Sequence, residues 1–141
     1  MADKIPARLR RQVMLRAGGH CEYCLMPESF TLLALHVDHI IARKHGGQTT
    51  PANLALACAD CNWAKGSDIA ALDPDGGEVI ALFNPRTDIW GEHFIFGEGK
   101  ITGLTPKGRA TAQLLNFNTP QRIRERNDLA ALGVIPFFRQ N

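Results

Sequence analysis

The sequence predicts a single α+β domain over residues 1–141, and three observations support this class. Of the 141 residues, 45% are apolar and 21% charged, as in an ordinary globular domain with one core. Segments with the patterns of strands and of helices follow one another without an internal repeat. The four cysteines fall in two Cys-x-x-Cys pairs, Cys21/Cys24 and Cys58/Cys61. This pattern predicts that the two segments that carry the pairs, although far apart in the sequence, are held together at one site.

The first half begins with a basic helix over residues 6–17. Pro6 suits the first helical position, and Gly18 and Gly19 end the helix. The segments expected after it are a buried strand over 31–37, a loop over 42–53, a short strand or turn over 54–56, and a short helix over 59–66.

The second half is expected to contain a turn at 73–77, a strand over 78–83, and a β-hairpin made from 92–96 and 100–104. Two helices follow, over 106–117 and 120–132. Each begins with a threonine that can cap the helix and a first-turn proline, at Thr105-Pro106 and Thr119-Pro120.

The spacing of the cysteines favours a structural zinc site. Zinc takes four ligands in a tetrahedron, at about 2.3 Å for sulfur, and a gap of two residues lets one turn offer two thiolates. Disulfides, a redox pair and an iron–sulfur centre are the alternatives. Disulfides fit poorly with the absence of a signal peptide, and a redox motif needs only one pair. Four protein ligands close the metal's shell, so this zinc would not be catalytic.

Charge is unevenly distributed along the chain. Residues 1–16 and 105–126 each carry five Lys or Arg against one acidic residue, whereas 66–99 carry seven Asp or Glu against one Arg. Basic segments suit a phosphate backbone, although solvated helix faces are the simpler interpretation. No apolar run approaches the roughly 18 residues of a membrane span, and the N-terminus resembles no signal peptide. We therefore expect a cytoplasmic protein without membrane contact.

Residues 36–66 combine several chemically active side chains: HVDHIIARKHGGQTTPANLALACADCNWAKG. Asp38 and His39 end a predicted strand, Asn53 follows a glycine-rich loop, and Cys58-x-x-Cys61-Asn62-x-x-Lys65 opens a predicted helix. Together with the Cys21/Cys24 pair, this pattern over 20–66 resembles the HNH endonucleases, or ββα-metal nucleases, in their zinc-stapled form. Asn62 replaces the final histidine of the motif, which makes the chain an H-N-N variant.

The resemblance implies a ββα-metal (His-Me finger) core stapled by a four-cysteine zinc, with an N-terminal helix and, over 73–141, a C-terminal β-hairpin plus two helices. It also implies metal-dependent hydrolysis of DNA to 5′-phosphate and 3′-hydroxyl ends. His39 would be the general base, and Asp38 and Asn62 would hold one Mg²⁺ or Mn²⁺. Asn53 would tie its loop to the backbone near His39 and so orient the base.

Two geometric expectations follow from this assignment. Adjacent residues of a strand point to opposite faces, so Asp38 and His39 reach one phosphate only if regular strand geometry fails near 38–39. Cys61 and Asn62 lie about 100° apart on a helix, so that Cys61 can face zinc while Asn62 faces the catalytic ion.

Other residues are weaker candidates. His36 shares strand parity with Asp38 and could support the metal ligands, although an ordinary strand histidine is the simpler interpretation. The two tryptophans, Trp63 and Trp90, are expected to pack in a core. Contacts to the DNA backbone are expected from basic side chains: Lys65, Arg8, Arg11 and Arg122.

Two other functions remain open from the sequence. A non-catalytic, zinc-ribbon-like module that binds nucleic acid would need the cysteines and the basic segments, but not Asp38, His39 or Asn62. A redox or scaffold protein would use the cysteine pairs without zinc. For a nuclease, double-stranded DNA is the expected substrate, and a homodimer is one way to cut both strands.

Overall fold

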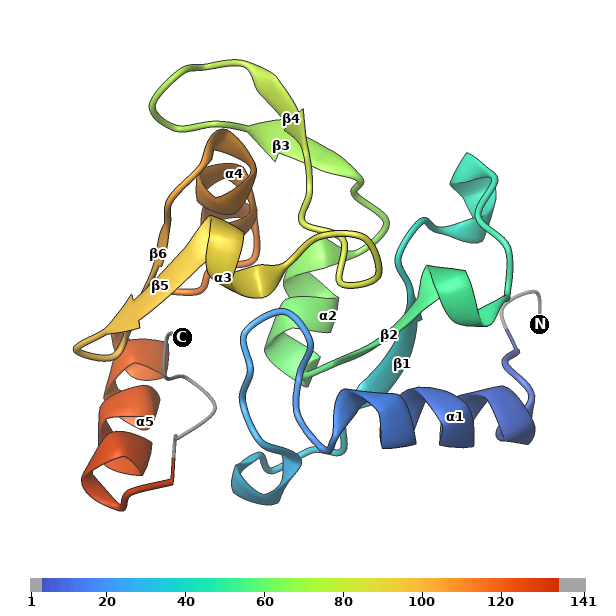
Figure 1. Ribbon diagram of the computed structural model, residues 1–141, viewed down its shortest axis with the longest axis horizontal. Helices are drawn as coiled ribbons and strands as arrows, with labels where there is room; N and C mark the ends of the chain where they lie inside the picture. The colour runs from blue at the N-terminus through green and yellow to red at the C-terminus, as the bar shows by residue number, and fades with distance from the viewer. Residues whose placement is uncertain (1–3, 135–141) are drawn as a thin grey trace. The chain divides into compact units, whose positions relative to one another are not determined.

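The computed structural model describes residues 4–134, which fall into two compact units (Figure 1). The first runs to Ile69 and includes Asn84–Arg86, and the second comprises Ala70–Phe83 and the chain from Thr87 onward. Among the described residues, helices are combined with three separate two-stranded antiparallel sheets. The predicted α+β class is therefore confirmed, while the single domain over 1–141 stays a prediction.

The first unit contains one two-stranded sheet and two α-helices. Its elements are, in order, α1 (Ala7–Ala17), η1 (Glu28–Phe30), β1 (His36–His39), η2 (Arg43–His45), η3 (Pro51–Asn53), β2 (Leu54–Ala57) and α2 (Ala59–Lys65), where η marks a 3₁₀ turn. Strands β1 and β2 pair antiparallel, from His36 opposite Ala57 to His39 opposite Leu54. The strand that carries Asp38 and His39 is thus anchored to the strand that leads into α2.

Helix α1 forms the core of the first unit with β2. Leu9, Val13 and Ala17 recur at helical spacing and are buried against Leu54 and Leu56. Full burial of one such side chain contributes about 2 kcal/mol. The basic character of the helix does not prevent this packing, because only the stripe of apolar positions faces the sheet.

Arg16 joins the end of α1 to the start of β2. Its guanidinium donates to the carbonyl oxygens of Pro51 at 2.9 Å and of Leu54 at 2.6 Å. The charge of Arg16, expected to belong to a DNA-facing segment, is thus used partly within the fold.

The described part of the second unit contains two two-stranded sheets and three α-helices. Its elements are β3 (Ala70–Leu72), β4 (Val79–Ala81), α3 (Trp90–His93), β5 (Phe94–Gly97), β6 (Lys100–Gly103), α4 (Pro106–Leu114) and α5 (Pro120–Ala131). The core contains Phe94, whose ring centroid lies 5.4 Å from that of Phe83 and 5.6 Å from that of Phe117. Both predicted caps are present, since Thr105 accepts from the Gly108 amide and Thr119 from the Arg122 amide.

The strand expected over 31–37 is only partly correct. Strand β1 begins at His36, and the apolar residues before it do not form a strand. Leu32 and Leu33 are exposed, and the Thr31 hydroxyl bonds to the carbonyls of Glu28 and Leu33. These local bonds satisfy backbone groups without a sheet partner. Strand β3, to which the sequence analysis assigned no element, pairs with β4 although its Ala-Ala-Leu sequence has little strand preference.

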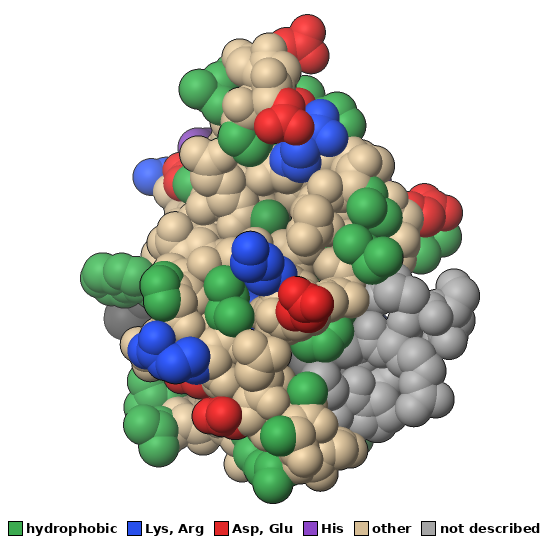
Figure 2. Space-filling model, turned by 90° about the vertical axis from the view of Figure 1, so that its left-hand side faces the viewer, with side chains coloured by type: hydrophobic (Ala, Val, Ile, Leu, Met, Phe, Trp, Pro, Cys, Tyr) green, Lys and Arg blue, Asp and Glu red, His purple; other side chains and the backbone are tan. Residues whose placement is uncertain are grey.

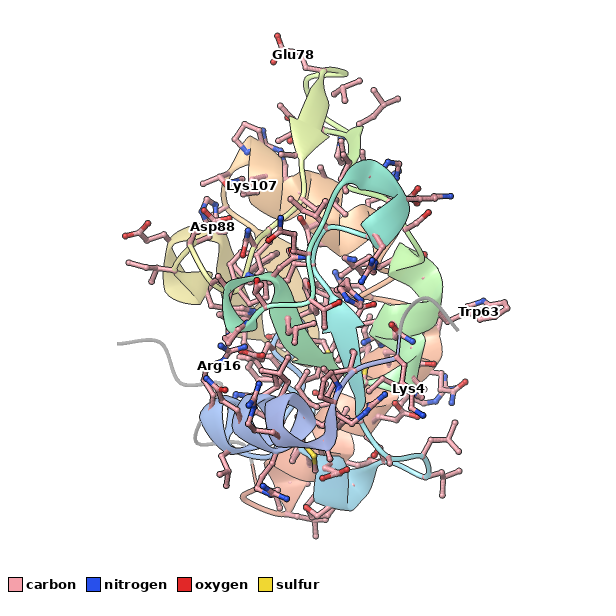
Figure 3. All side chains as sticks on the ribbon, turned by 90° about the vertical axis from the view of Figure 1, so that its right-hand side faces the viewer. Lys4, Arg16, Trp63, Glu78, Asp88 and Lys107 are labelled. Carbon is pink, nitrogen blue, oxygen red and sulfur yellow. The ribbon has the colours of Figure 1, made fainter. Side chains whose placement is uncertain are left out.

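Two expectations about side chains in helices are wrong. Trp63 does not pack in a core, because its side chain on α2 is 89% exposed and projects from the helix (Figure 3). Arg122, expected to contact DNA, is 6% exposed and donates to the carbonyls of Leu115 and Asn116. Arg126 is likewise buried and donates to Gly99 and Phe117. The guanidinium groups of both arginines therefore donate hydrogen bonds to backbone carbonyl oxygens within the second unit.

An ion pair joins α4 to the turn between β3 and β4. Arg109 donates from Nε and Nη2 to the two carboxylate oxygens of Asp73, each at 2.9 Å. The same carboxylate accepts from the Asp75 amide at 3.0 Å. The Arg109 guanidinium is the main cause that lowers the pKa of Asp73 to about 2.

We expect the second unit to lose stability in acid through Asp73. Its folded pKa of about 2 lies below the usual 3.8, so the stabilisation is fully present above about pH 4 and disappears as the pH falls toward 2. Asp73→Asn should therefore lower the unfolding temperature at pH 7, and its difference from the wild type should shrink in acid.

Thermal unfolding followed by circular dichroism at pH 7, 4 and 2 measures this effect. Asp68→Asn, at an exposed carboxylate that forms no ion pair within residues 4–134, is the control and should leave the unfolding temperature nearly unchanged. A difference between Asp73→Asn and wild type that stays constant across this range would contradict the assignment.

Candidate active site

Four cysteine side chains meet at the start of α2. Cys21 and Cys24 come from the turn after α1, and Cys58 and Cys61 from the N-cap and first turn of α2. All four are buried and unpaired by disulfides, and their sulfur atoms lie within 4.8 Å of one another. A tetrahedron with zinc–sulfur bonds of about 2.3 Å has edges of about 3.8 Å. The cluster therefore has the composition and size of a four-cysteine zinc site.

Backbone amides support the sulfur atoms as metal ligands. The amides of Tyr23 and Cys24 donate to Cys21 Sγ, and that of Cys61 donates to Cys58 Sγ, all at 3.4 Å. Such bonds favour the thiolate. Burial, in contrast, raises the pKa of the Cys21 and Cys61 thiols. A bound cation would offset this burial and hold the group as thiolates at neutral pH.

Glu22, inside the first cysteine pair, fastens that turn to β2. Its backbone amide donates to the Leu56 carbonyl at 2.8 Å, and its carboxylate accepts from the Leu56 amide at 2.9 Å. The carboxylate also pairs with the Arg86 guanidinium. Arg86 is thus a partner of the cysteine turn, and no local motif could have indicated a pairing across 64 residues.

Lys65 connects α2 to the strand that carries Asp38. Its ammonium lies 3.2 Å from Asp38 Oδ2 and donates to the His39 carbonyl at 3.1 Å. Burial raises the pKa of the Asp38 carboxyl, and the Lys65 charge opposes that rise. Because Lys65 is only 2% exposed, the structure places it as an internal partner of Asp38 rather than at the DNA-facing surface predicted for it.

His39 lies at the end of β1 with one ring nitrogen engaged. The residue is 8% exposed, and Nε2 is 2.8 Å from the Thr49 hydroxyl oxygen. The other nitrogen, Nδ1, has no hydrogen-bond partner within residues 4–134. Thr49 also accepts from Arg43 Nη1 at 3.2 Å. No sequence motif marks Thr49, because it is an ordinary threonine in a polar loop.

The failure of strand geometry expected near residues 38–39 comes directly after His39, where β1 ends and the backbone bends at Ile40. Both residues belong to β1, and the pairing runs through His39 opposite Leu54. The ladder ends one step later, where the Ile40 amide donates to the Asn53 carbonyl at 2.8 Å. Regular pairing is retained because the two side chains have different partners: Asp38 meets Lys65 on α2, and His39 meets Thr49 in the loop.

Asn53 fastens the loop that follows His39. Its Oδ1 accepts from the Ile41 amide at 2.9 Å, and its Nδ2 donates to the carbonyls of Ile41 at 3.0 Å and Gln48 at 2.8 Å. Gly47 makes this close approach feasible, because a Cβ there would lie 1.7 Å from the Ile41 oxygen. These are the contacts that the predicted orienting role of Asn53 requires.

Asn62 and His36 are placed differently around Asp38. Asn62 lies on α2 one turn before Lys65, is half-buried, and makes no side-chain hydrogen bond within residues 4–134. His36 is exposed at the start of β1 and makes no side-chain hydrogen bond there either, so the structure shows no contact through which it supports a ligand. The amide oxygen of Asn62 thus has no competing hydrogen bond in the described chain.

Exposed basic side chains occur on α1 and elsewhere among acidic ones. Arg8 and Arg11 are exposed on α1, as expected for contacts to a phosphate backbone. On the face shown in Figure 2, basic and acidic side chains are interspersed. In the second unit, Lys107 and Asp88, both labelled in Figure 3, form an ion pair at 3.0 Å.

Comparison with known proteins supports the interpretation of this region. Residues 21–68, about a third of the chain, match the family model of the HNH endonuclease. No curated protein and no solved structure shows significant similarity to the chain. The resemblance seen in the sequence is thus confirmed over residues 21–68, and similarity to this family indicates a nuclease-type hydrolase. Across residues 4–134, no helix has the length and apolar character needed to cross a membrane.

We expect Asn53→Ala to release the loop after His39 without unfolding the first unit. The variant loses three hydrogen bonds, each worth about 1 kcal/mol net. Amide hydrogen exchange at Ile41 measures the effect directly, because this amide donates to Asn53 Oδ1. Asn53→Asp is the matched control: it keeps an acceptor for Ile41 and should preserve more of the protection. Equal protection of Ile41 in the alanine variant and the wild type would contradict the assignment.

Proposed function

We propose that the chain is a metal-dependent endonuclease that hydrolyses phosphodiester bonds of double-stranded DNA. One observation carries the proposal. Within the HNH segment, His39 presents an unpartnered Nδ1 at the end of the strand on which Asp38 precedes it. A binding module needs neither an ordered imidazole nor a buried carboxylate beside it, whereas hydrolysis needs both a base and an anionic ligand.

His39 is the proposed general base. Its Nδ1 takes a proton from a water molecule as the water oxygen attacks phosphorus. The bond from phosphorus to the 3′ oxygen breaks, and solvent returns a proton to that oxygen. The products are a 5′-phosphate and a 3′-hydroxyl. Asn53 is the proposed orienting residue, since it fixes the backbone two residues beyond the base.

Asp38 and Asn62 are the proposed holders of one Mg²⁺ or Mn²⁺. A carboxylate and an amide oxygen are hard donors, and Mg²⁺ usually takes only one or two protein carboxylates, with water and phosphate as the remaining ligands. The Asn62 side chain has no competing hydrogen bond in the described chain, and Asp38 is 20% exposed at its side chain. The bound ion would stabilise negative charge on the leaving oxygen.

The ion pair with Lys65 fixes the position of the Asp38 carboxylate before a metal ion binds. The Lys65 ammonium lies 3.2 Å from Oδ2 and stabilises the half-buried carboxylate as an anion. Asp38 is thereby kept charged and fixed in direction. A structural zinc in the cluster of Cys21, Cys24, Cys58 and Cys61 is part of the same proposal, because it would hold the start of α2, and with it Asn62, beside β1.

Nicking of supercoiled plasmid by the full chain tests the proposal. Wild type should convert supercoiled to open-circular DNA with Mg²⁺ or Mn²⁺, and addition of EDTA to the reaction should stop it. His39→Ala should lower the rate by about 10²- to 10⁴-fold, which is the usual contribution of a general base. His45→Ala, at an exposed histidine of η2, is the matched control and should retain wild-type activity.

Two outcomes would contradict the proposal. Equal nicking by wild type and His39→Ala would mean that His39 is not the base. Binding of duplex DNA by wild type, without cleavage of a randomised-sequence substrate under either metal, would instead favour the non-catalytic binding module.

A further inference from the structure

Thr49 is a polar side chain that the proposed reaction does not use, although it contacts the proposed base. Its hydroxyl oxygen lies 2.8 Å from His39 Nε2 and accepts from Arg43 Nη1 at 3.2 Å. The residue is half-buried in the loop between η2 and η3. Three side chains from two neighbouring segments thus form a short chain of hydrogen bonds that ends on the imidazole.

The numbers of donors and acceptors on the three side chains limit the directions that these hydrogen bonds can take. A threonine hydroxyl offers one hydrogen and two acceptor positions. Arginine can only donate, so Arg43 takes one acceptor position of Thr49. Either Nε2–H donates to the second acceptor position, or the hydroxyl donates to an unprotonated Nε2. The two arrangements correspond to the two neutral tautomers of His39.

Only one of these arrangements leaves His39 able to act as the proposed base. The neutral imidazole carries one hydrogen, and the nitrogen without a partner in the described chain is Nδ1. For Nδ1 to accept a proton, the hydrogen must reside on Nε2. Thr49 must then be the acceptor, and its oxygen still has a free acceptor position after the bond from Arg43.

We propose that Thr49 is a positioning residue that selects the Nε2–H tautomer of His39 by accepting its hydrogen, a role that rests on the proposed nuclease function. The direction of the ring favours this role, because Nε2 is turned toward the loop while the residue is only 8% exposed. A buried N–H without an acceptor is costly. Loss of the Thr49 oxygen would therefore move the hydrogen to Nδ1 and block the base.

Asn53 also holds the loop that carries Thr49. Asn53 Nδ2 donates to the carbonyl of Gln48, the residue directly before Thr49, and to that of Ile41, two residues after His39. One amide thus fixes both sides of the pair formed by His39 and Thr49. The hydroxyl is held at hydrogen-bond distance from the ring by the same residue that the proposal assigns to orienting the base.

Two readouts on the zinc-loaded full chain test the inference. The ¹⁵N chemical shifts of the His39 ring, recorded at a pH where the ring is neutral and without added Mg²⁺ or Mn²⁺, report which nitrogen carries the hydrogen. Plasmid nicking reports the rate. The variants are Thr49→Val, which keeps the shape but removes the acceptor, and Thr49→Ser, which restores a hydroxyl. Thr50→Val is the control, since Thr50 makes no side-chain hydrogen bond in the described chain.

The expected result is an Nε2–H ring in wild type, Thr49→Ser and Thr50→Val, and a shift of the hydrogen toward Nδ1 in Thr49→Val. Nicking by Thr49→Val should fall on the order of 10-fold or more, with Thr49→Ser restoring most of it. A merely structural role would lower the rate without moving the tautomer.

An unchanged tautomer in Thr49→Val would overturn the inference while leaving the nuclease proposal standing if wild type still nicks DNA. An Nδ1–H ring in wild type would overturn the inference and also the assignment of Nδ1 as the base, whether or not wild type nicks DNA. Because the ¹⁵N shifts need no catalysis, they decide the role of Thr49 even if nicking fails in every variant. Such a failure would count against the proposed function alone.

Discussion

Closure of the four-cysteine cluster is the constraint on which the candidate site depends. Helix α2 has seven residues, too few to be stable in water by itself. Its first turn supplies two of the four sulfur atoms, and its last residue, Lys65, reaches Asp38 on β1. Asn62 lies between these two attachments. The helix therefore holds its orientation relative to β1 only if both of its ends are attached. The cysteines attach its N-terminal end, which follows β2.

A second set of contacts fixes the opposite side of His39. Asn53 bonds to backbone groups on both sides of the loop that carries Thr49, and Gly47 lets the two segments approach. The imidazole is thus held by a loop that depends on hydrogen bonds, whereas Asp38 is held by a helix that depends on sulfur and an ion pair. Neighbouring residues at the end of β1 therefore have separate supports.

The sequence predicted the features that depend on local patterns. The two Cys-x-x-Cys pairs and the caps at Thr105 and Thr119 are local patterns, and the cysteine cluster and both caps are present in the structure. The HNH pattern is likewise matched by the family model. Features that depend on distant partners were missed. The ion pairs of Arg86 with Glu22 and of Arg109 with Asp73, and the burial of Arg122, each join segments whose proximity no local pattern reveals. Composition likewise suggested a DNA-facing role for arginines that instead satisfy carbonyl oxygens, and a packed Trp63 where the structure exposes it.

Amide hydrogen exchange over the whole chain, with one zinc per chain and after removal of zinc by a chelator, tests the central claim most directly. If the cysteine cluster fastens α2 to β1, removal of the metal should abolish protection in α2 and lower it in β1 and β2, while β5, β6 and α4 of the second unit keep theirs. Unchanged protection of α2 and β1 after removal of the metal would show that the site does not depend on the cluster.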